Sequence, residues 1–162
     1  MKRRHLLSLS AAALMPATAT PSIPPRFLHV GTYAPSGQGI YRFTIAADGT
    51  MEPLGVTLST GSPSWLLADA ARQRVYAAEE GANHVAVYRH DGEGTLTLLQ
   101  REPSGGHSPC HLSLGAGRLW AAHYADARFA ALAVQPDGRL APAHSWPSCS
   151  GSIVPSAAMV KR

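Results

Sequence analysis

The sequence has little charge: only 15% of its 162 residues are charged, against 45% hydrophobic residues. Disordered chains combine low hydrophobicity with high net charge, so this composition excludes disorder. The formal charge of +4 does not mark a basic surface, because five of the fourteen Lys and Arg residues lie at positions 2–4 and 161–162. The remaining nine are balanced by ten acidic residues. The body of the chain is therefore nearly neutral and offers no basic stripe for nucleic acid.

Cysteines and long apolar runs are also scarce. Cys110 and Cys149 are too few for a disulfide framework, and whether they pair is left open. The apolar run at residues 6–14 is too short to span a bilayer.

This short apolar run is typical of an export signal. It follows basic residues 2–4 and precedes Ala17-Thr18-Ala19, a small-x-small cleavage site. We therefore expect residues 1–19 to be removed and the mature protein to be periplasmic or secreted, with no membrane attachment. The pair Arg3-Arg4 resembles a twin-arginine signal, which leaves the twin-arginine and general secretory routes both open.

Glycine and proline are plentiful, with 15 and 13 residues, and they punctuate short apolar stretches as in all-β proteins. The stretches also repeat. Residues 39–45, 84–90 and 128–134 resemble one another at offsets of 45 and 44, and each is followed by Asp-Gly. Residues 62–66 match residues 108–112 at an offset of 46. A β-sandwich would not repeat the same residues at a constant offset.

Each period contains four short apolar stretches that we expect to be strands. In the second repeat they lie near residues 64–69, 73–79, 84–90 and 95–100, and in the third near 110–114, 118–123, 128–134 and 139–144. Asp-Gly between the last two strands favours a tight hairpin. Four strands in a period of about 45 residues predict the blades of a β-propeller.

The number of blades predicts an incomplete ring. Residues 27–30 correspond to the second strand of a blade, so residues 27–144 should form two full blades and three strands of another. A propeller needs about four to eight blades to close, so we expect this fragment to be inactive by itself. Residues 145–162 show no alternation. We expect an irregular tail there, which is either a loop or the product of a truncated or frame-shifted reading frame.

Loops at one end of the predicted blades gather ionisable side chains. The loop before the first strand and the loop after the second strand of a blade lie at the same end. This arrangement brings residues 107–111 beside residues 123–126, and residues 62–65 beside Glu79 and Glu80, with Tyr33 at the corresponding place in the first blade. Ionisable residues at one face of a repeat scaffold suggest a site. We expect Trp65 and Trp120 to lie in the core between blades instead.

Four segments carry a resemblance to a known family: residues 30–33, 75–80, 103–106 and 109–112. They resemble the propeller lactonases of the 6-phosphogluconolactonase type and the related carboxymuconate-cyclising enzymes. The resemblance implies a ring of about seven blades that hydrolyses a sugar lactone. It places the channel histidine on His111 and the strand-end residues on Glu80 and Tyr124. The family usually has Asn where this chain has Glu79 and His123.

The chemistry of these residues suits hydrolysis. His111 can act as a general base on water or as an oxyanion donor, and Glu80 can orient the imidazole or polarise water. Tyr124 can bind a sugar hydroxyl. We expect His123, Glu79 and Tyr33 to contribute to substrate binding. The simpler alternatives are a packed histidine at the channel wall for His111 and a solvated turn for the two glutamates.

Three functions follow from these expectations. The first is hydrolysis of a sugar lactone by a monomeric propeller that needs no metal and no cofactor, with the small-molecule lactone as its partner. The second is a non-catalytic exported scaffold that binds a ligand or a protein. The third is a muconate-lactone cyclase.

Overall fold

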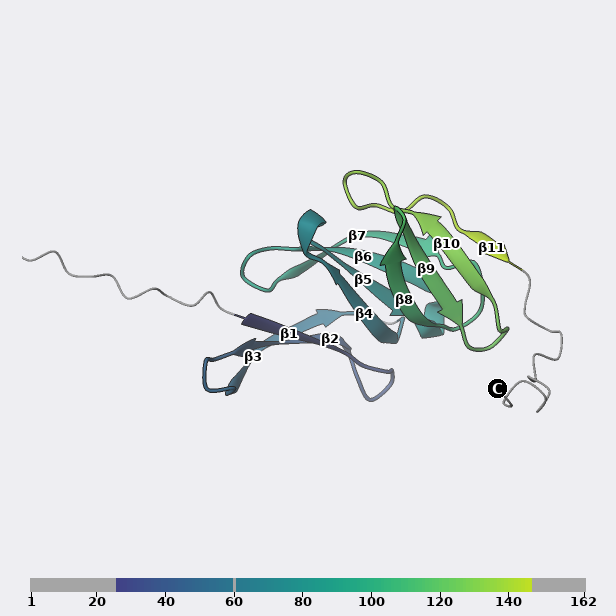
Figure 1. Cartoon of the computed structure of the whole chain (residues 1–162). Helices are drawn as coiled ribbons and strands as arrows, with labels where there is room; N and C mark the ends of the chain where they lie inside the picture. The colour runs from purple at the N-terminus through teal and green to yellow at the C-terminus, as the bar shows by residue number, and fades with distance from the viewer. Residues whose placement is uncertain (1–25, 60, 147–162) are drawn as a thin grey trace, which may run out of the picture.

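A computed structural model describes residues 26–59 and 61–146, which form three antiparallel sheets in chain order (Figure 1). The first sheet contains β1 (Arg26–Gly31), β2 (Gly39–Ile45) and β3 (Met51–Leu58). The second contains β4 (Pro63–Asp69), β5 (Arg74–Glu79), β6 (His84–His90) and β7 (Leu96–Pro103). The third contains β8 (Pro109–Gly115), β9 (Arg118–His123), β10 (Phe129–Ala133) and β11 (His144–Trp146). Two single turns of 3₁₀ helix, η1 (Ala70–Arg72) and η2 (Glu80–Ala82), connect strands of the second sheet.

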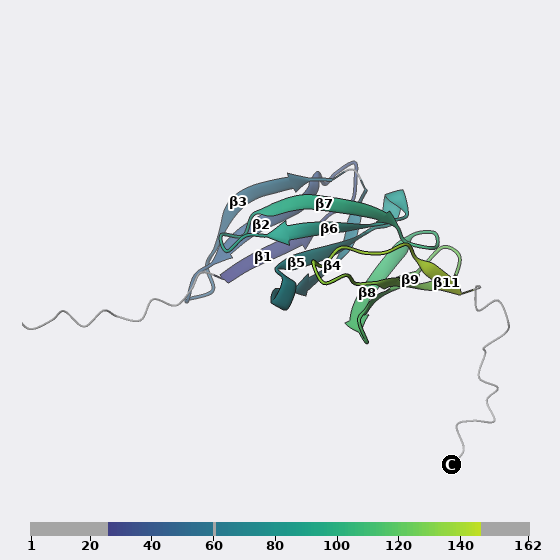
Figure 2. The same ribbon diagram turned by 90° about the horizontal axis from the view of Figure 1, so that it is seen from above.

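Each sheet is a meander in which sequential strands are neighbours, and we call the sheets the first, second and third blade. The blades lie side by side, since β4, the first strand of the second blade, contacts β1 of the first blade on one side and β8, the first strand of the third blade, on the other (Figure 2). The chain thus forms part of a β-propeller with one three-stranded and two four-stranded blades, which confirms the predicted fold and the predicted number of strands.

The Asp-Gly turns form as predicted because the aspartate side chain binds the backbone of its own turn. Oδ1 of Asp48 accepts from the N–H of Thr50 at 2.9 Å, and Oδ1 of Asp91 accepts from the N–H of Thr95 at 2.7 Å. Gly49 has a φ of +89°, in the left-handed region where glycine has no steric cost. These turns set the hairpins between the two outer strands of the first and second blades.

The hydrophobic core lies between the blades. Alternate residues of β5 point to opposite sides: Ala77 faces the first blade and Tyr76 faces the third. The cluster between the first two blades contains Ile40, Val75, Ala77, Ala86, Tyr88 and Leu96, and a second cluster of nine buried residues fills the space between the second and third blades. Neighbouring blades therefore cover each other's faces, as in other repeat proteins.

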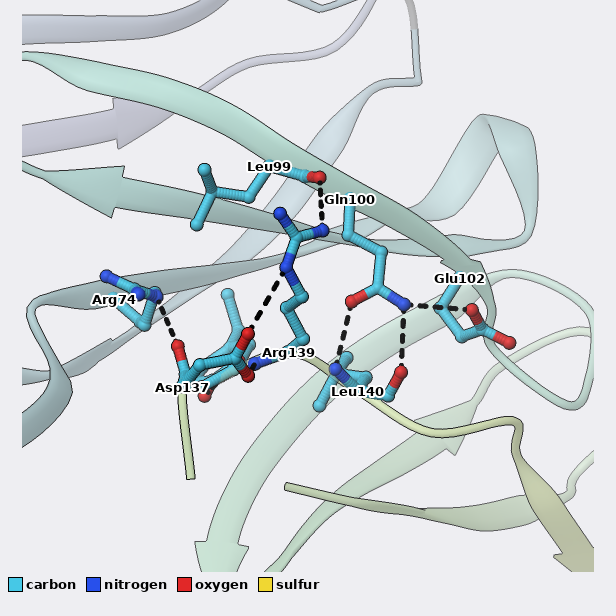
Figure 3. A network of polar contacts seen from close by, with 9 residues as sticks. Arg74, Leu99, Gln100, Glu102, Asp137, Arg139 and Leu140 are labelled. Carbon is cyan, nitrogen blue, oxygen red and sulfur yellow. Dashed lines mark hydrogen bonds and ion pairs between the residues drawn. The ribbon is translucent and has the colours of Figure 1, made fainter. Parts of the chain in front are cut away.

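The fourth strand of the third blade differs from the prediction. It lies at His144–Trp146 and pairs with β10, whereas a strand was expected over residues 139–144. The expected pairing still begins, since Leu140 forms an isolated bridge with Val134, and residues 139–140 also contact the second blade (Figure 3). The side-chain amide of Gln100 donates to the carbonyl of Leu140 at 2.8 Å and accepts from its N–H at 2.9 Å, while Arg139 donates to the carbonyl of Leu99 at 3.0 Å. Residues 139–140 are thus held against β7.

The predicted domain boundaries meet the structure only in part. Ser145 and Trp146, expected in the irregular tail, belong to β11. The predicted signal at residues 1–19, the remainder of the tail and Cys149 lie outside the described residues. Within residues 26–59 and 61–146, we find no helix with the length and apolar character needed to span a membrane.

Candidate functional site

The second and third blades begin with the same local structure. Ser62 and Ser108 have φ values of +53° and +54°, and each is followed by proline and a β-bulge. The bulges fall at Ser64 and Cys110, between the paired residues on either side. A bulge redirects the next side chain. Trp65 and His111 therefore occupy equivalent positions on β4 and β8, the first strands of their blades.

His111 lies exposed at the start of β8, and its closest aromatic neighbour is Trp65. The ring centroids are 4.4 Å apart and the planes are inclined by 51°. Trp65, expected in the core between blades, does contact the neighbouring blade through His111, but it belongs to neither buried cluster and 40% of its surface is exposed. Trp120 is half-buried and stacks on Trp146, with centroids 5.9 Å apart.

Glu80 pairs with Tyr33. The phenol of Tyr33 donates to Oε2 of Glu80 at 2.7 Å, which joins the loop after β1 to the turn η2 after β5. This hydrogen bond is the main cause that raises the pKa of Tyr33 above its usual value of 10.0. Tyr33 is 54% exposed and Glu80 is half-buried, so the phenol in particular can meet a ligand from solvent. The predicted contact between Glu80 and the imidazole of His111 is absent from the described hydrogen bonds, in which Glu80 binds Tyr33 instead.

Glu79 points the other way, into the protein. It is fully buried, and its carboxylate accepts from the hydroxyl of Ser59 at 2.7 Å and from Nε of Arg101 at 2.9 Å. Burial, followed by the charge of Glu79, raises the pKa of the nearby Tyr88. The prediction that Glu79 binds substrate therefore does not fit the structure. A carboxylate that is enclosed by two blades stabilises their contact.

His123 is also buried, with 4% of its surface exposed. Its Nε2 lies 3.0 Å from Oγ of Ser104, its Nδ1 lies 3.3 Å from the carbonyl of Arg128, and burial lowers its pKa below 6.5. The prediction that His123 binds substrate does not fit this position either. Further blades around a ring could only increase this burial, so the same argument holds for a complete propeller.

Glu79 and His123 occupy equivalent positions in consecutive repeats, at the end of the second strand of each blade. Each binds a serine, Ser59 or Ser104, and each lies against a glycine: a Cβ on Gly61 would come within 2.6 Å of Glu79, and one on Gly106 within 2.7 Å of His123. Both the serines and the glycines are 45 positions apart. This spacing is the signal that could have identified a buried polar contact from the sequence.

Tyr124 is 80% exposed, and its backbone N–H donates to the carbonyl of Ser108 at 2.9 Å. Of the predicted site residues, the structure therefore leaves His111, Glu80, Tyr33 and Tyr124 accessible at one end of the blades. They offer an imidazole, a carboxylate and two phenols, which suit proton transfer and binding of hydroxyl groups.

The chain belongs to a known family. Residues 27–157 match the model of the family described as "Lactonase, 7-bladed beta-propeller". The expected family resemblance is thus confirmed.

Three relatives illustrate the family. The 6-phosphogluconolactonase of Bacillus subtilis is 31% identical over 120 residues, which are 69% of this chain and 34% of that protein. A provisionally assigned 6-phosphogluconolactonase of Bacteroides fragilis has a TM-score of 0.72 and 27% identity over 80% of this chain and 38% of its own. The periplasmic gluconolactonase of Pseudomonas aeruginosa has a TM-score of 0.67 and 25% identity over 75% of this chain and 38% of its own. The chain thus spans little more than a third of the length of these relatives.

Proposed function

We propose that the accessible end of the blades belongs to the active site of a sugar-lactone hydrolase, in which His111 is the general base. The observation that carries the proposal is the position of His111. It lies exposed on the first strand of a blade in a lactonase-family propeller, whereas His123, the other candidate histidine of the third blade, is buried.

Hydrolysis would proceed by attack of water on the ring carbonyl of the lactone. His111 removes a proton from the attacking water as the new C–O bond forms. The ring C–O bond of the tetrahedral adduct then breaks, and the imidazolium returns the proton to the leaving ring oxygen, which becomes a hydroxyl of the open acid. Proton transfer of this kind contributes about 10²–10⁴ in rate. Glu80 and Tyr33, which are already hydrogen-bonded, and the exposed Tyr124 supply acceptors and donors for sugar hydroxyls. This chain provides one sector of the site, and the remaining blades of a ring provide the others.

We further propose an unphosphorylated lactone as the substrate. Two arginines near this end, Arg101 and Arg128, are each paired with a carboxylate, Glu79 at 2.9 Å and Asp126 at 3.5 Å. Neither is therefore a ready partner for a phosphate dianion. The export expected from residues 1–19 would agree with this substrate, and the Pseudomonas relative is a periplasmic gluconolactonase. Mass spectrometry of the secreted or periplasmic protein should show cleavage near Ala19, and an intact Met1 there would contradict export.

The activity is tested in a completed propeller, by which we mean this chain joined to the further blades of a family member. A pH-stat assay follows opening of glucono-δ-lactone against the spontaneous rate. His111→Ala should lower the catalysed rate at least about 100-fold. His107→Ala is the matched control, because His107 is exposed in the adjoining loop and should cost little. Equal rates for wild type and His111→Ala would overturn the assignment and favour a non-catalytic binding propeller.

A further inference from the structure

We propose that Trp65 is a positioning residue for the imidazole of His111. This inference rests on the proposed function. Trp65 contacts His111 from the neighbouring blade, and the indole restricts the plane of the imidazole that accepts the proton from water. This role would account for Trp65, a large aromatic side chain that belongs to neither buried cluster.

The first observation is geometric. The two rings lie 4.4 Å apart with an inclination of 51°, and both follow a bulge on the first strand of a blade. The blades are joined at this point, because the hydroxyl of Ser64 donates to the carbonyl of Pro109 at 3.3 Å. This hydrogen bond ties the two strands together beside the ring contact.

The second observation is how other histidines are held. Nε2 of His29 lies 2.9 Å from the carbonyl of Gly94, and both ring nitrogens of His123 have polar partners. Across residues 26–59 and 61–146, the side-chain hydrogen bonds include none to the ring of His111. Packing against Trp65 is therefore the described interaction that can orient this imidazole. It leaves both ring nitrogens available for water and substrate.

The third observation is exposure. Trp65 leaves 40% of its surface in solvent although it is among the most apolar side chains of β4. The same bulge in the third blade carries His111, so the fold does not require tryptophan here. General-base catalysis needs the nitrogen within hydrogen-bond reach of the proton, and a misplacement of about 1 Å can cost about 10²-fold.

The test compares variants of the completed propeller. Trp65→Leu removes the aromatic face, and we expect kcat to fall about 10- to 100-fold with KM changed less than about twofold. Trp65→Phe keeps an aromatic face and should retain kcat within about threefold. Trp120→Leu is the control, since Trp120 stacks on Trp146 and is not in contact with His111, and it should leave kcat unchanged.

A second measurement does not depend on the variants' activity. In wild-type protein the imidazole protons of His111 should be displaced upfield in the NMR spectrum by the indole ring current. That displacement should persist in Trp65→Phe and vanish in Trp65→Leu. A wild-type spectrum without the displacement would overturn the inference, even if Trp65→Leu failed to fold.

The outcomes separate this inference from the function it rests on. Loss of activity in His111→Ala with normal kcat in Trp65→Leu would overturn the positioning role alone. A raised KM with normal kcat in Trp65→Leu would also overturn it and would make Trp65 a binding platform. Full activity in His111→Ala would overturn the proposed function itself.

Discussion

The buried carboxylate of Glu79 makes a strong prediction about stability. Its two partners are Ser59, which follows the first blade, and Arg101 on β7 of the second blade. The perturbation is Arg101→Ala, which leaves the carboxylate enclosed with its hydrogen bond from Ser59 and with the hydroxyl of Tyr88 nearby. Because Glu79 is fully buried and Arg101 is 41% exposed, removing the arginine should cost more than neutralising the glutamate.

The magnitude follows from this asymmetry. Breaking a buried ion pair by removing one partner costs about 3–5 kcal/mol, and the bond that Ser59 still donates puts Arg101→Ala near the lower end, at about 3 kcal/mol. Glu79→Gln keeps a hydrogen-bonding side chain of the same shape and should cost about 1 kcal/mol. Arg128→Ala breaks a longer ion pair, 3.5 Å from Asp126 with the arginine 46% exposed, and should cost less than about 1 kcal/mol.

The assay is urea-induced unfolding of the completed propeller and its three variants, with the free energy of unfolding taken from the midpoint and slope. Arg101→Met is the packing control, because it restores the aliphatic stem without the charge. It should remain nearly as unstable as Arg101→Ala. Equal losses for Arg101→Ala and Arg128→Ala, or a loss below about 0.5 kcal/mol for the former, would refute the role of Glu79 as a buried contact between blades.

Two further predictions concern the glycine beside Glu79 and two partly or fully buried histidines. Gly61→Ala should lower the free energy of unfolding by about 1–3 kcal/mol, because its Cβ would lie 2.6 Å from Glu79. The control Gly115→Ala meets nothing within 4 Å and should stay within about 0.5 kcal/mol of wild type. Equal unfolding midpoints for the two variants would contradict this. Burial lowers the pKa of His29 and His123 below 6.5, so the unfolded chain binds these protons more readily and the free energy of unfolding should fall as the pH drops below about 6.5. The double variant with Asn at both positions should show a smaller fall between pH 7.5 and 5.5 in urea unfolding, and an undiminished fall would argue against these two histidines.

The sequence was sufficient for the regular part of the fold. The limits of β6 and β9 agree with the predicted residues 84–90 and 118–123, because alternation and turn residues determine both strands locally. The displaced fourth strand of the third blade was not predictable in this way. It coincides with contacts from Gln100, forty positions away, whose side-chain amide binds the N–H and carbonyl of Leu140, the groups that this residue turns away from its bridge partner Val134.

In the candidate site, the sequence alone also fails to predict which of two adjacent residues is buried. Glu79 and Glu80 are adjacent and chemically identical, yet one is fully buried and the other binds an exposed tyrosine. Residue type and loop position indicate that such side chains gather at one end of the blades. They do not indicate which of two neighbours points inward. That choice depends on whether a serine and a glycine from the preceding connection enclose the side chain.

The repeat therefore divides this end of the propeller into two layers. The inner layer pairs Ser59 with Glu79 and Ser104 with His123. A serine hydroxyl can donate to a carboxylate and can donate to or accept from an imidazole, so the layer accepts either residue without a change of backbone.

The outer layer consists of two positions in each blade. One directly follows the inner residue at the end of the second strand, as Glu80 and Tyr124 do, and the other directly follows the bulge of the first strand, as Trp65 and His111 do. The outer positions differ in kind between the blades. They also contact the neighbouring blade, Glu80 through Tyr33 and Trp65 through His111, so a change there alters those contacts together with the accessible surface. Binding and catalysis in the remaining blades should therefore also depend on these two positions.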